Sequence, residues 1–371
     1  MHDSTPVDAN ESATDRRTFL GRAAALSLVI PGIAATACSN SEQPPRAGAT
    51  TNVRPTHNSD SRLDSTLLKG QRHGGTSATG TATQGAQSVA YHRWDPTLPP
   101  PSASGHVQLH WHAHEAPVRL SADTVVAGWT FEGDIPGPLV HCRVGDTVEF
   151  TLTNDADIPH SIDFHAAQLD PKQAFKSVPK GQSVTCTFKP KYAGAFMYHC
   201  GTSPVLMHIG SGMFGALIVS PREPLPAAKD FVLIQNEFYL AEAAGVPAAV
   251  RASDYQKMLN MIPDLVCFNG RPNQYLDAPI HVKLGDRVRF WVVSAGPSHP
   301  CHFHVVGEQF DKIYLGTPPA NAITGVQTFS VAPGGGSIFE LVCDVAGEFP
   351  FVNHGFGHGQ KGAMGLLVVD A

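Results

Sequence analysis

Short segments in which apolar and polar residues alternate recur along residues 106–371. Val144–Phe150 and Leu284–Phe290 are two examples, and each contains a Gly-Asp pair before the alternating part. Gly, Pro and Asp interrupt the segments, and little helical periodicity is visible. A period of two places successive side chains on opposite faces of a strand. The pattern therefore predicts an all-β fold made of antiparallel sandwiches.

This part of the chain also repeats itself. Three pairs of segments match: 144–150 with 284–290, 181–199 with 335–354, and 215–219 with 365–369. The second copy has two extra residues before His354, which places Gly355 where the first copy has Cys200. The repeat predicts two tandem Greek-key β-sandwich domains, one over residues 106–222 and one over residues 223–371.

The first 37 residues resemble an export signal. Asp15–Leu20 contains a twin-arginine motif, and the apolar run Ala23–Ala37 is short for a membrane span. Ala35–Cys38 is typical of a lipoprotein cleavage site, which would make Cys38 a lipid anchor. Ordinary cleavage beside an unmodified cysteine is the alternative. In both cases we expect export by the twin-arginine route to the periplasm or the cell surface.

Residues 38–105 are rich in Ser, Thr, Gly and Pro and poor in large apolar residues. Such a stretch buries too little apolar surface to offset the entropy lost on ordering. We therefore predict a disordered tether over this range, stiffened near Pro96–Pro101.

Composition narrows the classes of function. The net charge is −6, and no basic stretch suggests a nucleic-acid partner. The seven cysteines show no paired framework. Cys142 and Cys186 lie in neighbouring β-patterned segments, and the sequence leaves open whether they form a disulfide or remain buried thiols.

Metal-binding residue types gather in the first repeat. If His160 points into its own domain, strand alternation sends Asp163 and His165 to the opposite face. The same alternation at His199–Cys200 turns the thiol inward and the imidazole outward. The inward face then collects His160, Cys200, His208 and Met213. Two His, one Cys and a weak axial Met are the ligands of a blue, electron-transfer copper site.

The outward face collects His165, His199 and Asp163, an imidazole-rich set suited to a second copper ion. His199 and Cys200 are adjacent, so a single peptide bond would join the two sites. The arrangement predicts an enzyme with two copper ions per chain.

From about residue 106 to residue 371 the chain resembles the copper-containing nitrite reductases, two-domain relatives of the multicopper oxidases with cupredoxin-like domains. The resemblance rests on His160-x-x-Asp163-x-His165, on His199, Cys200, His208 and Met213, on Phe303–Gly307 and on Val352–His354. It implies type 1 copper at His160, Cys200, His208 and Met213, and type 2 copper at His165, His199 and His354.

The resemblance further implies a homotrimer in which His354 reaches the type 2 site of a neighbouring subunit. Asp163 and His304 would supply protons, and Val306 would shape the substrate pocket. The implied reaction is the one-electron reduction of nitrite to nitric oxide, as in denitrification. The electron would come from a small redox protein, either a cupredoxin or a c-type cytochrome.

One departure keeps other functions open. His299–His304 resembles the His-Pro-x-His-x-His run of laccase-like multicopper oxidases, which reduce oxygen to water. Their three-copper cluster needs an imidazole on each side of the cysteine, and here Gly201 follows Cys200. An oxidase remains the alternative, and a plain one-copper electron carrier is a third hypothesis. We expect His110–His114 to form the polar face of the first strand.

Overall fold

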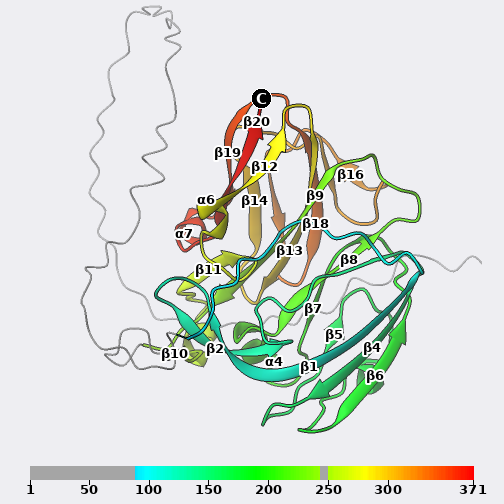
Figure 1. The fold of residues 1–371 in the computed structure, drawn as a ribbon, viewed down its shortest axis with the longest axis vertical. Helices are drawn as coiled ribbons and strands as arrows, with labels where there is room; N and C mark the ends of the chain where they lie inside the picture. Colours follow the sequence, from blue (N-terminus) through cyan, green and yellow to red (C-terminus); the bar gives the residue numbers. More distant parts are fainter. Residues whose placement is uncertain (1–87, 243–249) are drawn as a thin grey trace, which may run out of the picture. The chain divides into compact units, whose positions relative to one another are not determined.

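The computed structural model describes residues 88–242 and 250–371. These residues form two β-sandwiches, one after the other along the chain (Figure 1). The all-β prediction with two sandwich domains is confirmed. The predicted export signal, Cys38 and most of the predicted tether lie in residues 1–87, outside the described part. Among the described residues, no helix is long and apolar enough to cross a membrane.

The first sandwich packs a five-stranded sheet against a four-stranded one. The larger sheet contains, in spatial order, β10 (Val250–Arg251), β2 (Val125–Phe131), β1 (His106–Arg119), β4 (Thr147–Asn154) and β6 (Ser183–Phe188). The smaller sheet contains β3 (Val140–Arg143), β8 (Phe214–Ser220), β7 (Gly194–His199) and β5 (Asp163–Phe164). Two short helices complete it, α3 (Pro171–Ala174) and α4 (Val205–Gly210).

The second sandwich packs a six-stranded sheet against a five-stranded one. The larger sheet contains β11 (Leu265–Phe268), β9 (Lys229–Phe238), β13 (Arg287–Gly296), β18 (Gly336–Val342), β15 (Lys312–Tyr314) and β16 (Ala322–Ile323). The smaller sheet contains β12 (Ala278–Lys283), β20 (Met364–Asp370), β19 (Gly347–Asn353), β14 (Cys301–Val305) and β17 (Thr328–Val331). The helices in this part are α5 (Tyr255–Leu259), α6 (Gln274–Asp277) and α7 (Phe356–Gln360).

The two sandwiches share their strand pairing, as the sequence repeat predicts. β1 runs parallel to β4 as β9 does to β13, and β3 runs parallel to β8 as β12 does to β20. β7 and β19 begin at equivalent glycines, Gly194 and Gly347, and pair with β8 and β20 without an insertion. Counting from these glycines places Asn353 at the position of Cys200. The alignment that placed Gly355 there was wrong, because the extra residues it required do not exist in the strand pairing.

Buried apolar residues from both sandwiches form one continuous cluster. Its members include Met197 and Phe214 from the first sandwich and Trp291 and Ile338 from the second. β7 contacts both β13 and β18, so the strand that precedes Cys200 lies directly against the second sandwich. Burial of this shared apolar surface stabilises the pair of domains as one body.

Arg271 joins three segments of the chain at the domain boundary. Its side chain is only 2% exposed and lies 2.6 Å from the Asp134 carboxylate. It donates further hydrogen bonds to Ile135 O at 2.5 Å and to His92 O at 3.0 Å. A buried guanidinium needs such partners, because an uncompensated charge inside a protein is costly.

The last part of the predicted tether is ordered. Leu98 N donates to Asp230 O at 3.0 Å, and Val232 N donates to Pro96 O at 2.7 Å. Trp94 and Leu98 pack against the cluster shared by the two sandwiches. The tether prediction was therefore wrong for this stretch. A few apolar residues are enough to order a polar segment when its backbone pairs with an existing strand.

The six cysteines in the described ranges are free and buried. Cys142 and Cys186 are thus two thiols, which settles the alternative that the sequence left open. Burial raises the pKa of Cys142 to about 12 and that of Cys186 to about 11.

Candidate metal centres

The inward donor set predicted from the sequence is assembled inside the first sandwich. The donor atoms of His160, Cys200 and His208 all lie within 4.8 Å of one another, and the three side chains are buried. Met213 is also buried, and its backbone is bonded to two of them. Met213 N donates to His208 O at 3.1 Å, and Cys200 N donates to Met213 O at 3.1 Å.

Each donor comes from a different local structure. His160 forms an isolated bridge to Val178 shortly before β5. Cys200 directly follows β7, and His208 lies on α4, which begins after Pro204. Three separate segments of the chain therefore bring their donor atoms together at one place.

Burial controls the charge of this inward set. It lowers the pKa of His160 to about 4, with a smaller contribution from His208, and it lowers the pKa of His208 as well. The two imidazoles are therefore neutral, as metal binding requires. The Nε2 atoms of both rings are buried without a hydrogen-bond partner. Burial raises the pKa of the Cys200 thiol, and hydrogen bonds from Ser161 and Thr202 oppose that effect.

Two neighbours of this set were not identified from the sequence as site residues. Ser161 N donates to Cys200 Sγ at 3.3 Å, a bond that stabilises negative charge on sulfur. The Trp129 ring lies edge-on to His208, with centroids 4.8 Å apart, and to His160 at 5.9 Å. Ser161 follows a predicted ligand directly, so its position alone could have indicated this contact. The contact of Trp129 depends on how β2 packs.

The outward set is also assembled. Donor atoms of Asp163, His165 and His199 lie within 4.8 Å of one another. The two Nε2 atoms are 3.1 Å apart. His165 Nδ1 is bonded to Gly334 O and His199 Nδ1 to Cys200 O, each at 2.9 Å. A carbonyl oxygen only accepts, so each Nδ1 carries the proton and each Nε2 presents a lone pair.

Two lone pairs at this separation repel each other unless a cation or a proton lies between them. Imidazoles oriented through Nδ1–H bonds to carbonyl groups are the usual arrangement of metal-binding histidines. Burial lowers the pKa of His199, and the neighbouring His165 lowers it further, which disfavours a proton in that place. The outward set therefore fits a metal ion. Gly334 belongs to the second sandwich, so that domain orients a ligand of the first.

The remaining predicted site residues lie in the second sandwich. The His304 and His354 rings are 5.3 Å apart, and both line an open pocket of about 450 Å³. His304 Nδ1 is bonded to Gln327 O at 2.6 Å. Val306 does not line this pocket, although it lies two residues beyond His304. Within the described part of a single chain, His354 does not belong to the His165–His199 group.

Asn353 occupies in the second sandwich the position that Cys200 has in the first. Ser161 N donates to Cys200 Sγ at 3.3 Å, and His302 N donates to Asn353 Oδ1 at the same distance. The helix after each position also matches, because His358 O accepts from Ala363 N as His208 O accepts from Met213 N. The residues equivalent to Cys200 and Met213 are thus Asn353 and Ala363, which do not form a blue copper site.

The side-chain amide of Asn353 forms hydrogen bonds through both its oxygen and its nitrogen. Its side chain is fully buried, and Oδ1 also accepts from Gly355 N at 2.9 Å. Nδ2 donates to Gln235 Oε1 at 2.6 Å and to Pro300 O at 3.2 Å, and lies 3.4 Å from His358 Nδ1. This amide therefore fixes the turn that begins at His354.

The laccase-like run His299–His304 is shifted in strand register relative to the corresponding segment of the first sandwich, His160–His165. By spacing alone, His302 would match Asp163. In the sheets, however, Asp163 pairs with His199, and His304 pairs with Val352, the residue equivalent to His199. The strand pairing therefore places His304 at the position of Asp163, two residues later than the spacing suggests.

Comparison with known proteins agrees with this geometry. The multicopper oxidase family profile matches residues 112–224. The copper-containing nitrite reductase of Neisseria meningitidis serogroup A is 36% identical over 272 residues, which cover 71% of this chain and 69% of that protein. The solved copper nitrite reductase from Nitrosomonas europaea is 34% identical, with a TM-score of 0.65, and the match covers 71% of this chain and 94% of that one. The solved blue copper oxidase from the same organism is 25% identical, with a TM-score of 0.59 over 71% of this chain and 86% of its own. The identity and coverage show that this chain belongs to the copper-containing nitrite reductases, a family of oxidoreductases.

Proposed function

We propose that this protein reduces nitrite to nitric oxide: one electron and two protons are consumed, one N–O bond is broken and water is released. The observation that carries the proposal is the pair of donor sets on opposite sides of the residues that end β7. Cys200 belongs to the buried set and His199 to the outward set, and the two residues are adjacent. His199 Nδ1 also donates to Cys200 O, so a hydrogen bond accompanies the covalent path.

In this proposal type 1 copper is held by His160, Cys200, His208 and Met213, and type 2 copper by His165, His199 and His354. Bound copper would supply the stored electron at the first site and a Lewis-acid position for a nitrite oxygen at the second. The apolar burial of the first set keeps water away from the thiolate. The partial exposure of the second set admits a small anion.

We infer that His354 reaches the outward set of a neighbouring subunit in a homotrimer. Within one chain that set has two imidazoles whose Nε2 atoms are aligned, and one more would complete a three-nitrogen site. His354 is exposed in a pocket of the other sandwich and stands apart from His165 and His199 of its own chain. A contact between subunits would bring the two halves together.

Asp163 and His304 are the proposed proton donors. Asp163 lies in the outward set, within 4.8 Å of the imidazole donor atoms. His304 lines the pocket beside His354, and its Nδ1 is held by Gln327 O, which leaves Nε2 for proton exchange with bound nitrite or with water. Val306, one residue beyond the end of β14, is the proposed apolar wall that would limit the approach of ligands once subunits assemble.

We also propose a cellular location for the protein and a class of electron donor. The twin-arginine motif and the sequence around Cys38 support work in the periplasm or at the cell surface, with or without a lipid anchor. A small cupredoxin or c-type cytochrome would deliver the electron, because the reaction needs one electron at a time.

A laccase-like oxidase is the second candidate, supported by the likeness to the blue copper oxidase. Two observations favour the reductase. Gly201 follows Cys200, and the strand pairing that places His304 at the position of Asp163 leaves Val306, not a histidine, at the position of His165.

The test is an anaerobic assay of the copper-loaded protein with nitrite and a reduced single-electron donor. We expect nitric oxide in proportion to nitrite consumed. Oxygen consumption with a laccase substrate, without nitric oxide from nitrite, would favour the oxidase.

A further inference from the structure

The outer face of β1 is unusually rich in histidine. Its five successive outward positions are His106, Gln108, His110, His112 and His114. Four of the five are histidine, although histidine accounts for only 19 of the 371 residues in the chain. Trp111 and Ala113, which alternate with them, are buried in the first sandwich. The stripe is thus a surface feature that core packing does not require.

β4 contacts the His106 ring, whose Nε2 lies 3.7 Å from Glu149 Oε2, but it does not engage His110 or His112. β4 runs beside β1 and presents Thr151 and Thr153 next to His110 and His112. Those hydroxyls pair instead with β6, at 2.9 Å in each case. Among the described residues, the rings of His110 and His114 form no hydrogen bond or ion pair.

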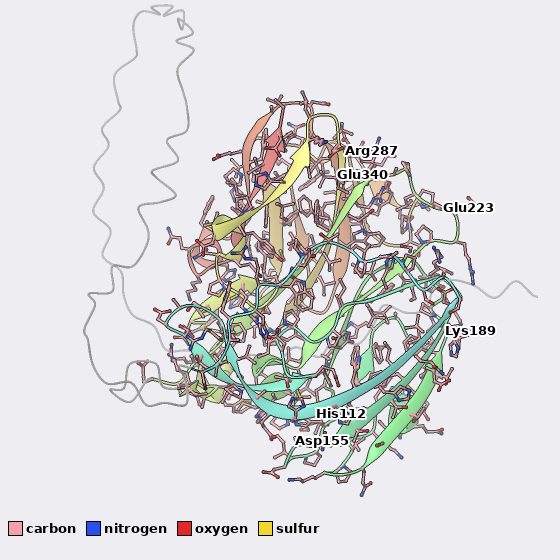
Figure 2. All side chains as sticks on the ribbon, in the orientation of Figure 1. His112, Asp155, Lys189, Glu223, Arg287 and Glu340 are labelled. Atoms are coloured by element: carbon pink, nitrogen blue, oxygen red, sulfur yellow. The ribbon has the colours of Figure 1, made fainter. Side chains whose placement is uncertain are left out.

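His112 is oriented by a carboxylate. Its Nδ1 lies 2.6 Å from Asp155 Oδ2, and the two side chains are 51% and 50% exposed (Figure 2). A carboxylate accepts, so Nδ1 carries the proton and Nε2 keeps its lone pair. A histidine held in this way by a carboxylate has a fixed tautomer and a more basic free nitrogen, as metal-binding histidines do.

We propose that His110 and His112 bind a divalent transition-metal ion on the outer face of β1, apart from the two copper sets. Residues two apart on a strand are separated by roughly 6.6 Å, and their side chains point the same way, so two imidazoles can converge on one ion. Among the described residues, the only groups of three donors within 4.8 Å are the two copper sets, so the protein offers no third ligand at this place. Water molecules would complete the coordination of the ion. Two imidazole ligands favour Cu²⁺ over the other divalent ions of its row.

The chain contains a matched control. His281 Nδ1 lies 3.2 Å from Asp370 Oδ2, and these side chains are 58% and 57% exposed. This pair resembles His112–Asp155 in chemistry and exposure. The residues two positions away on its strand are Pro279 and Lys283, so no second imidazole is available. His281→Ala therefore removes an exposed, carboxylate-bound histidine without removing a chelating pair.

The experiment is equilibrium dialysis of the fully copper-loaded protein against micromolar Cu²⁺, followed by copper analysis. We expect one more Cu²⁺ per chain in the wild type and in His281→Ala, and loss of that ion in His112→Ala and in His110→Ala. An unchanged blue absorption band in all four proteins controls for folding. The proposal is overturned if the wild type binds no further ion, if the ion persists in His112→Ala, or if His281→Ala loses it.

Discussion

Replacement of Asn353 by leucine tests how the second sandwich positions the type 2 ligand that it would supply. Leucine has the same branched arrangement of four side-chain heavy atoms, though a larger volume, and it neither accepts nor donates a hydrogen bond. The substitution leaves His302 N and Gly355 N without their acceptor, and Gln235 Oε1 and Pro300 O without their donor. His354 lies between Asn353 and Gly355, so its turn loses the side-chain bonds from Asn353 and keeps only backbone bonds such as His354 N to His302 O.

The magnitude follows from burial. A buried polar group left without a partner costs about 1–3 kcal/mol. Asn353 and Gln235 are fully buried, whereas His302 and Gly355 are only partly so, and water can replace some of the lost bonds. Counting two full penalties at the lower half of that range gives a loss of about 3 kcal/mol in the free energy of unfolding. We expect a larger effect on type 2 copper than on blue copper, because the buried copper set lies in the other sandwich.

The assay combines copper analysis, visible absorption and denaturant unfolding of Asn353→Leu. We expect the blue band to remain, type 2 copper to fall and the unfolding midpoint to shift down. Asn260→Leu, at an exposed asparagine after α5, is the control and should change none of these. The reasoning is refuted if Asn353→Leu keeps full type 2 copper with wild-type stability, or if it loses blue copper while keeping type 2.

The remaining predictions concern the proposed ligands, the proton donors and the domain boundary. Cys200→Ser should abolish the intense visible band while type 2 copper remains, measured by absorption and electron paramagnetic resonance. His354→Ala should remove type 2 copper and keep the blue band; retention of both ions would contradict the assignment. Asp163→Asn and His304→Ala should each keep both ions and lower nitrite turnover on the order of 10²-fold; loss of copper in either would show a ligand role instead. Arg271→Ala should lower the free energy of unfolding by about 2 kcal/mol, less than for a fully buried pair because its partner carboxylate is partly exposed; an unchanged free energy of unfolding in a denaturant titration would contradict this role of Arg271.

The two donor sets were predictable because the position of a residue within its own strand determines the face on which its side chain lies. Alternation along a strand fixes which of two adjacent residues points inward, so His199 and Cys200 had to face opposite ways. The same rule separated His160 from Asp163 and His165. No knowledge of the distant packing was needed, and the structure groups these residues as the alternation predicts.

The features that sequence reasoning missed depend on contacts between distant segments. Trp94 lies in a mostly polar stretch, and the buried cluster shared by the two sandwiches gives it a place to pack. The sequence alignment missed the equivalence of Asn353 and Cys200 because it matched His354 to His199. The strand pairing instead fixes the register from Gly347. Gly334 orients His165 from the other domain, and no local pattern indicates such a bond.

The most direct test of the central claim is the copper content of each chain, divided by spectroscopic type. The measurement is best made in His112→Ala protein, so that the proposed surface ion does not add to the count. We expect two copper ions per chain, one with the blue absorption of a thiolate ligand and one without it. One ion per chain would indicate an electron carrier, and four would indicate an oxidase with a three-copper cluster; either result would contradict the account.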